Sequence, residues 1–110
     1  MDSLKKTEDF SRCYKKGISK ANRLLVMYYI QNGTDSSRIG ISVSKKTGNS
    51  VTRHRLKRQI RESYRLHEAM FNSGLDIAVV VRRQAAESDY HGIESALLDL
   101  AGKLGILNDT

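Results

Sequence analysis

The stretch RIGISVSKKTGNSVTRHRLKRQIRESYR, residues 38–65, holds a strand pattern followed closely by a helix pattern. In residues 38–44, isoleucine and valine alternate strictly with glycine and serine, which is typical of a half-buried strand with a small, polar second face. From about Asn49 to Met70 the pattern is helical, and Asn49 or Ser50 can cap the first turn. The stretch therefore predicts a strand, a short turn KKTG and a long helix.

Two further strands and two further helices are expected around this unit. LLVMYYI (24–30) is rich in β-branched and aromatic residues, and its seven-residue connection to 38–44 suggests a hairpin. LDIAVVV (75–81) is nearly continuous in apolar residues, which predicts a central strand. A short helix is expected from Thr7, a capping hydroxyl, to Gly17, and a last helix from Ser88 or Asp89 to Leu104.

The predicted order is α-β-β-α-β-α in one domain, residues 1–110. This is an α+β two-layer sandwich in which a small sheet is packed by helices. Any βαβ crossover in it is expected to be right-handed by the general rule.

The composition is that of a globular protein, with 39% apolar and 28% charged residues. No apolar run approaches the roughly 18 residues of a membrane span, and the first residues lack the apolar core of a secretory signal. We therefore expect a cytoplasmic protein. Cys13 is the only cysteine, so an internal disulfide or a cysteine-based metal site cannot form, and a packing role is expected.

The net charge of +7 is concentrated in one segment of the chain. Residues 45–65 carry eight basic residues and one acid, whereas the rest of the chain carries eleven of each. A local excess of this kind indicates a binding surface for a polyanion.

Helical spacing separates an apolar face of the long helix from a basic stripe beside it. The expected apolar face consists of Leu56, Ile60, Ser63, Tyr64 and His67. The expected basic stripe consists of His54, Lys57, Arg58, Arg61 and Arg65. Like charges four residues apart repel each other, so a merely solvated face is the weaker interpretation. Arginine favours phosphate recognition, and the helix start behind Lys45 and Lys46 would add free N–H groups.

The segment GNSVTRHRLKRQIRE, residues 48–62, closely resembles the "RNR" signature of the bacterial ribonuclease P protein family. His54 replaces the usual asparagine of that signature, and histidine can still donate and accept hydrogen bonds. The resemblance covers nearly the whole chain: LKKTEDFSRCYKKG is similar to the family's first helix, ANRLLVMYY to its first strand, and RIGISVSKKTGN to its second.

The resemblance implies the protein subunit of an endoribonuclease whose catalyst is a large RNA. The protein would assist that RNA, with Mg²⁺ in the RNA complex, to remove the 5′ leader of precursor tRNA. No catalytic side chains are expected in the chain itself. The implied partners are ribonuclease P RNA and precursor tRNA, with a monomer when free and a 1:1 complex with the RNA. The resemblance also implies an unusual left-handed βαβ crossover, which would override the general rule.

The resemblance places RNA-binding residues on the signature helix and a cleft for the single-stranded leader beside the first helix. With the stripe and the helix start included, the expected RNA-binding residues are Lys45, Lys46, Arg53, His54, Lys57, Arg58, Arg61 and Arg65. The expected leader-cleft residues are Phe10, Tyr14 and Tyr28. Aromatic side chains can hold unstacked bases, although by composition alone these could be ordinary core aromatics.

Two other classes of function remain as alternatives. A nuclease in its own right could use His54, His67, His91 or Glu62 as acid or base, but no Asp/Glu cluster with metal-ligand spacing accompanies them. A DNA-binding module or a ribosomal protein could also use a long basic helix. The presence of a second, aromatic site favours structured RNA together with a single strand.

Overall fold

The computed structural model describes residues 2–108 and contains three α-helices on a five-stranded sheet. In chain order the elements are β1 (Asp2–Ser3), α1 (Thr7–Lys16), β2 (Ile18–Ala21), β3 (Leu25–Gln31), β4 (Arg38–Val43), α2 (Ser50–His67), β5 (Leu75–Val81) and α3 (Tyr90–Leu104). Three short 3-10 helices connect them: η1 (Lys45–Thr47), η2 (Glu68–Met70) and η3 (Arg83–Glu87). The predicted α-β-β-α-β-α order is therefore present, with the short strands β1 and β2 added.

The sheet has the strand order β1-β4-β5-β3-β2. β5 is central, as its apolar sequence predicts, and pairs parallel with β4 and antiparallel with β3. The expected hairpin between 24–30 and 38–44 is wrong, because β5 lies between those two strands. A strand that is apolar on both faces gains most from the fully covered central position, and this outweighs the short connection between β3 and β4.

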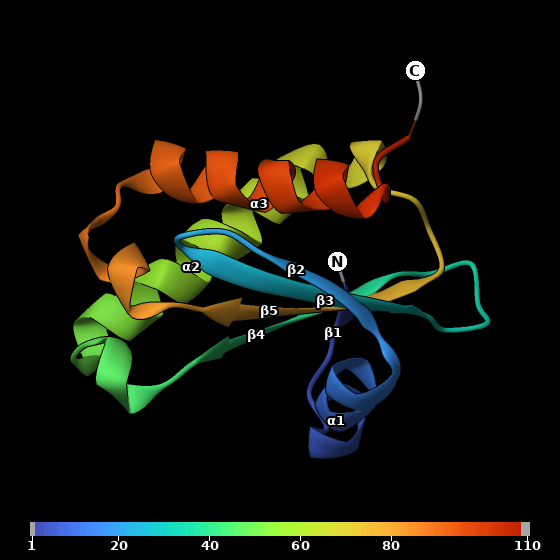
Figure 1. The fold of residues 1–110 in the computed structure, drawn as a ribbon, viewed down its shortest axis with the longest axis horizontal. Coiled ribbons are helices and arrows are strands. Elements are labelled where there is room, and N and C mark those ends of the chain that lie inside the picture. The colour runs from blue at the N-terminus through green and yellow to red at the C-terminus, as the bar shows by residue number, and fades with distance from the viewer. Residues whose placement is uncertain (1, 109–110) are drawn as a thin grey trace.

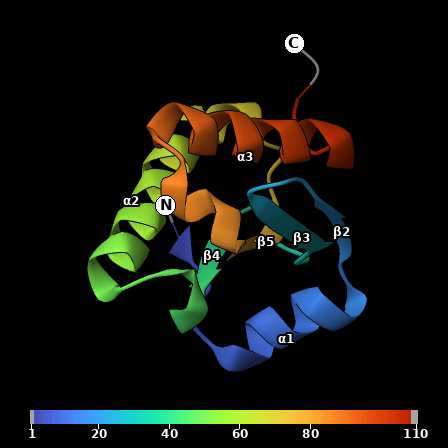
Figure 2. The same ribbon diagram turned by 60° about the vertical axis from the view of Figure 1, so that its left-hand side comes forward.

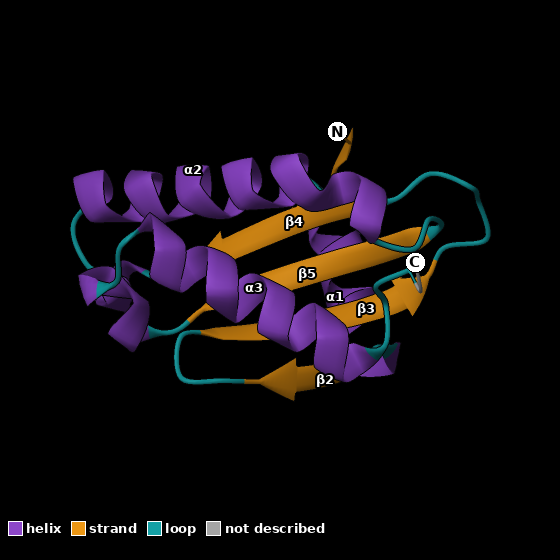
Figure 3. Ribbon diagram, turned by 90° about the horizontal axis from the view of Figure 1, so that it is seen from above, coloured by secondary structure: helices purple, strands orange, loops and turns teal. Residues whose placement is uncertain are grey.

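The connection from β4 through α2 to β5 is a βαβ crossover, because the two strands are parallel. Figure 3 looks onto the sheet from the side of α2 and α3, with β4 and β5 pointing the same way. If the strands are turned to point upward in this view, β5 lies to the left of β4, so the crossover is left-handed. The left-handed crossover that the resemblance implies is therefore confirmed, and the expectation from the general right-handed rule is wrong.

Helices cover both faces of the sheet, and the α+β class is confirmed. α2 and α3 lie together on one face, and α1 lies across the opposite face (Figures 1 and 2). The larger core lies under α2 and α3, where Leu56, Ile60 and Tyr64 pack with Leu97 and Leu100. A smaller cluster lies under α1. Within residues 2–108, no helix has the length and apolar character needed to cross a membrane.

The helix ends follow the sequence signals with one exception. The Asn49 side chain accepts a hydrogen bond from the Thr52 N–H at 2.9 Å, which caps α2. Asp89 caps α3 in the same way through the Gly92 N–H. Thr7 was expected to cap α1, but it is the first helical residue, and Lys6 at the cap position makes no side-chain hydrogen bond.

Candidate nucleic-acid interface

The basic stripe of α2 lies on a helix whose other side is held in the core. Leu56, Ile60, Ser63 and Tyr64 are buried, as the helical spacing predicts. His54, Arg58, Arg61 and Arg65 are exposed, and Arg53 and Lys57 are half-buried. Packing of the buried side of α2 therefore fixes the direction in which its cations project.

Most of these cations are free of acidic partners. Of the eight expected RNA-binding residues, only Arg65 lies within 4.0 Å of a carboxylate among residues 2–108. Arg65 binds Glu62 on the preceding turn, and its hydrogen bond lowers the pKa of the Glu62 carboxyl. Lys45, Lys46, Arg53, Lys57, Arg58 and Arg61 therefore present uncompensated positive charge, which favours a phosphate backbone.

The start of the stripe adjoins the end of β4. A small depression there is lined by Val43, Ser50, Arg53, His54 and Lys57. The guanidinium of Arg53 is oriented by the hydrogen bond from its Nε to the carbonyl of Gly48, at 3.2 Å. His54 is exposed at this point, so the residue that departs from the family signature lies on the candidate interface.

Arg55 has a different environment from the other arginines of the signature. Its Nη1 donates to the carbonyl of Ser88 at 3.0 Å, and its Nη2 donates to the carbonyl of Ala86 at 2.6 Å. Arg55 thereby joins α2 to the end of η3. Sequence spacing alone shows which face Arg55 occupies, but not that another segment of chain lies against that face.

The acid or base candidates His54, His67, His91 and Glu62 do not all lie at one place, although two of the histidines share a partner. His67 Nδ1 lies 2.8 Å from the carbonyl of Ser63, and its Nε2 lies 3.7 Å from Glu94. His91 lies 4.0 Å from the same glutamate, whereas His54 is at the other end of α2. In the part of the chain that the structure describes, no three His, Cys, Asp or Glu side chains form a cluster that could hold a metal ion.

The three aromatic residues of the expected leader cleft lie together between α1 and the sheet. The ring centroids of Tyr14 and Tyr28 are 4.9 Å apart in an edge-on arrangement, and those of Phe10 and Tyr14 are 6.2 Å apart. Tyr14 is 41% exposed, whereas Phe10 and Tyr28 are half-buried. Burial raises the pKa of the Tyr14 phenol, and the nearby Ser42 hydroxyl acts in the opposite direction.

Phe10 has a packing role as well. It packs against the small cluster of Leu4, Cys13 and Ala78, and a Cβ added to Gly40 would lie only 2.4 Å from its ring. The absence of a side chain at Gly40 thus lets α1 approach β4. Tyr14 is accordingly the member of the trio best placed to meet a base.

α1 covers only part of its face of the sheet, and no other helix of residues 2–108 lies over the rest (Figure 2). Ser42 on β4 pairs with Val80 on β5, which pairs with Val26 on β3, and all three are half-buried. They lie on the α1 side of the sheet, because Val43, Val81 and Leu25 beside them face the larger core. This face begins at Tyr28, beside Tyr14 of α1. It carries apolar side chains together with the hydroxyl of Ser42, which suits the binding of stacked bases.

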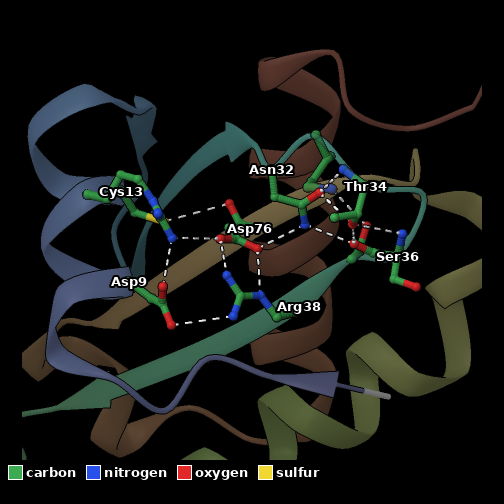
Figure 4. Close-up of polar contacts among 10 residues, drawn as sticks. Asp9, Cys13, Asn32, Thr34, Ser36, Arg38 and Asp76 are labelled. Carbon is green, nitrogen blue, oxygen red and sulfur yellow. Dashed lines mark hydrogen bonds and ion pairs between the residues drawn. The ribbon is translucent and has the colours of Figure 1, made fainter.

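A buried ionic cluster holds α1 in place, and sequence analysis missed it (Figure 4). Asp76 on β5 is fully buried and accepts hydrogen bonds from Arg38 at 2.9 and 2.6 Å and from Asn32 at 3.0 Å. Asp9 and Arg12 of α1 join it, with Arg12 3.5 Å from Asp76 and Arg38 3.4 Å from Asp9. Because Asp76 interrupts an otherwise apolar strand, its sequence position could have indicated a buried partner.

The carboxylate of Asp76 is ionised despite its burial. Burial by itself opposes ionisation, but the hydrogen bonds from Arg38 and Asn32 outweigh it, so the pKa of Asp76 lies below its ordinary value. Beside the cluster, the Cys13 thiol lies 3.8 Å from the Asp76 carbonyl, and burial raises its pKa to about 11.

Comparison with known proteins gives one consistent result. The family model described as Ribonuclease P matches residues 1–105. The ribonuclease P protein component of Lachnoclostridium phytofermentans is 53% identical over 100 residues, which are 91% of this chain and 86% of that protein. The solved RNase P protein of Staphylococcus aureus superposes with a TM-score of 0.91 at 39% identity, covering 98% and 99% of the two chains. That of Thermotoga maritima gives 0.85 at 32% identity, covering 94% and 97%.

Proposed function

This chain belongs to the ribonuclease P protein family, and from that premise we propose how its two surfaces divide the work of tRNA maturation. The basic stripe of α2 binds the RNA subunit, and the aromatic cleft under α1 holds the 5′ leader of precursor tRNA. Cleavage itself is carried by the RNA with Mg²⁺, and this chain supplies no catalytic side chain. The free chain is a cytoplasmic monomer that forms a 1:1 complex with the RNA.

The observation that carries the proposal is the set of six cations before and along one side of α2 that have no acidic partner among residues 2–108. A solvated helix face normally alternates its charges and gains ion pairs, whereas Lys57 and Arg61 are like charges one turn apart. Such an arrangement is favourable only when an external anion compensates it. Arg55, which is bound to backbone carbonyls, is excluded from this set.

The cleft supports the second half of the proposal. A leader is single-stranded, and single strands bind where aromatic rings can stack on bases. Tyr14 is exposed at the mouth of the cleft and the half-buried Tyr28 lies against it. The stripe begins beside Val43 at the end of β4, and the neighbouring Ser42 of the same strand faces the α1 side, so one protein can contact the RNA subunit and the leader at once.

The decisive experiment reconstitutes the chain with a bacterial ribonuclease P RNA and follows precursor cleavage at low Mg²⁺. Under these conditions the RNA alone is expected to be slow, because little cation screens the repulsion between RNA and substrate. We expect the chain to stimulate cleavage strongly, and Lys57→Ala/Arg61→Ala to lose most of that effect. The control variant Lys20→Ala/Lys103→Ala also removes two positive charges, but outside α2, and it should keep the stimulation of cleavage.

Binding to the RNA subunit supplies an independent measurement. If the stripe contacts four to six phosphates, the logarithm of the association constant should fall with the logarithm of salt concentration with a slope of roughly −3 to −5. The double variant of Lys57 and Arg61 should reduce that slope by about 2. A nearly flat dependence would contradict the proposed phosphate contacts.

The cleft is tested by comparing precursor with mature tRNA, since only the precursor has a leader. Tyr14→Ala in the reconstituted enzyme should weaken precursor binding by roughly tenfold, as expected from the loss of one stacked base. Mature tRNA should bind as before. An equal loss for both RNAs would show that Tyr14 acts only through the fold.

A further inference from the structure

A second basic site lies where β4 and β5 end side by side. Because these strands are parallel, the chain leaves both at the same edge of the sheet, into η1 after β4 and into η3 after β5. A pocket between the two 3-10 helices is lined by Ser44, Lys46, Thr47, Arg82, Arg83 and Glu87, among others. Neither the family signature nor the aromatic cleft includes the η3 side of this pocket.

The charges of the pocket favour an anion. Lys46 and Arg83 are exposed, and neither lies within 4.0 Å of a carboxylate in the described range 2–108. Arg82 donates from Nη1 to the carbonyl of Asn22 at 3.0 Å, which orients its guanidinium and leaves its other N–H groups free to donate. Glu87 is the one acid in the lining, so the pocket keeps an excess of two positive charges.

Thr47 provides a second observation that is independent of the charges. Its side chain is buried in the pocket wall, and its Oγ1 has no hydrogen-bond partner within the described residues. A buried hydroxyl without a partner is costly for the fold, and such groups are uncommon in native proteins. A ligand in the pocket that accepts a hydrogen bond would explain why a hydroxyl is placed there.

The position of the pocket indicates its occupant. On β5, Ala78 is buried under α1, and the uncovered face of the sheet begins beyond it and runs through Val80 to Arg82. Arg82 follows directly after β5 and lies four positions beyond Ala78, which is about 13 Å along an extended chain. A polynucleotide that lies on this face with its bases at Tyr14 and Tyr28 would bring its backbone to the pocket.

We propose that the pocket between η1 and η3 binds a backbone phosphate of the leader strand. The inference rests on the proposed role of the aromatic cleft and extends it. Stacking on tyrosine tolerates any base and does not by itself fix which nucleotide occupies the cleft, whereas a phosphate contact fixes the register of a strand. Arg83 and the free N–H groups of Arg82 would bind the phosphate oxygens, and Thr47 would donate its hydroxyl. Lys46, which belongs to the RNA-binding set, would add its positive charge from the η1 side of the pocket.

Arg83→Gln in the reconstituted enzyme tests the proposal, with Lys103→Gln as a control that removes one positive charge at the end of α3. We expect Arg83→Gln to weaken precursor binding by about three- to tenfold and to reduce its salt slope by about 1. The affinities for mature tRNA and for the RNA subunit should not change. Lys103→Gln should match the unmodified protein in all three measurements.

A precursor series in which single leader linkages are replaced by uncharged methylphosphonates locates the contact. Replacement of one particular linkage should weaken precursor binding to the unmodified protein. The same replacement should not weaken binding to Arg83→Gln any further. Thr47→Val, which removes the hydroxyl at nearly constant volume, should weaken precursor binding while the free energy of unfolding stays equal or rises. Unchanged precursor affinity in Thr47→Val would overturn the site as described.

Three other outcomes would overturn the inference. In the first, Arg83→Gln weakens the binding of precursor and mature tRNA equally. In the second, it weakens only the binding of the RNA subunit. In the third, Arg83→Gln and Lys103→Gln behave identically. The Tyr14→Ala measurement separates this failure from that of the cleft. If Tyr14→Ala loses precursor binding selectively while Arg83→Gln does not, the cleft stands and the pocket is not a leader site. If neither variant is selective, the proposed leader cleft itself is wrong.

Discussion

Arg38 binds the buried carboxylate of Asp76 with two hydrogen bonds, from Nε to Oδ1 at 2.9 Å and from Nη2 to Oδ2 at 2.6 Å. This pair joins neighbouring strands, and through Asp9 and Arg12 it also joins the sheet to α1. α1 carries Phe10 and Tyr14, so the ionic cluster determines where the candidate leader cleft opens.

Asp76→Asn should lower the free energy of unfolding by roughly 2–4 kcal/mol, because Arg38 and Arg12 lose the buried charge that compensates them. This expected loss is smaller than that for breaking a fully buried ion pair, because the Arg38 side chain is 34% exposed. Urea unfolding followed by circular dichroism measures it. Asp35→Asn, in the exposed loop after β3, serves as the control and should change stability by less than about 0.5 kcal/mol. Equal stability of the two variants would contradict the role of the cluster.

The same carboxylate should make the protein sensitive to acid. The pKa of Asp76 is lower in the folded protein than its ordinary value of 3.8, so the folded state binds this proton less readily than the unfolded chain does. Its contribution is therefore complete above that ordinary value and is lost as the pH falls from there through the folded pKa. Unfolding measured across this acidic range should show a steeper loss for the unmodified protein than for Asp76→Asn. Parallel curves would exclude Asp76 as the source.

Cys13 should be nearly inert toward alkylation in the folded protein. Cys13 lies on the buried, sheet-facing side of α1, and a pKa of about 11 in place of 9.0 lowers the thiolate fraction at neutral pH by about a hundredfold. Iodoacetamide labelling followed by mass spectrometry should therefore report the opening of α1. Asp76→Asn should label faster than the unmodified protein, whereas Asp35→Asn should not. Rapid labelling of the unmodified protein would show that α1 does not protect the thiol.

Arg55 and Arg58 should separate stability from RNA binding within one helix. Arg55→Ala breaks two hydrogen bonds to the carbonyls of Ala86 and Ser88 and should cost about 1–3 kcal/mol of folding stability. Arg58→Ala should leave stability within about 0.5 kcal/mol.

For RNA binding the order of the two variants should reverse. Arg58→Ala should reduce the salt slope for the RNA subunit by about 1, and Arg55→Ala should leave the slope unchanged at a temperature where the variant is folded. If Arg55→Ala changes the slope as much as Arg58→Ala does, Arg55 also contacts phosphate.

Several features could be predicted from local patterns, since they depend on neighbours along the chain. The spacing of Leu56, Ile60 and Tyr64 predicted the buried side of α2, and its basic stripe follows from the same period. Asn49 was correctly expected as one of two possible caps. Thr7 does not cap α1, because the helix begins at Thr7 itself. A shift of one residue in the helix start changes which side chain occupies the cap position.

By itself, the sequence determined the types of the main elements, the central place of the apolar strand and the concentration of charge on one helix. Periodicity and composition are enough to decide these properties. Tertiary structure alone decided that β5 separates β3 from β4, that Asp76 meets Arg38 from 38 positions away, and that Arg55 is bound to backbone carbonyls while Arg58 is exposed. The physical reason is that these outcomes depend on contacts between segments far apart in the chain. Local spacing shows which face a side chain occupies, whereas only the packed fold shows what lies against that face.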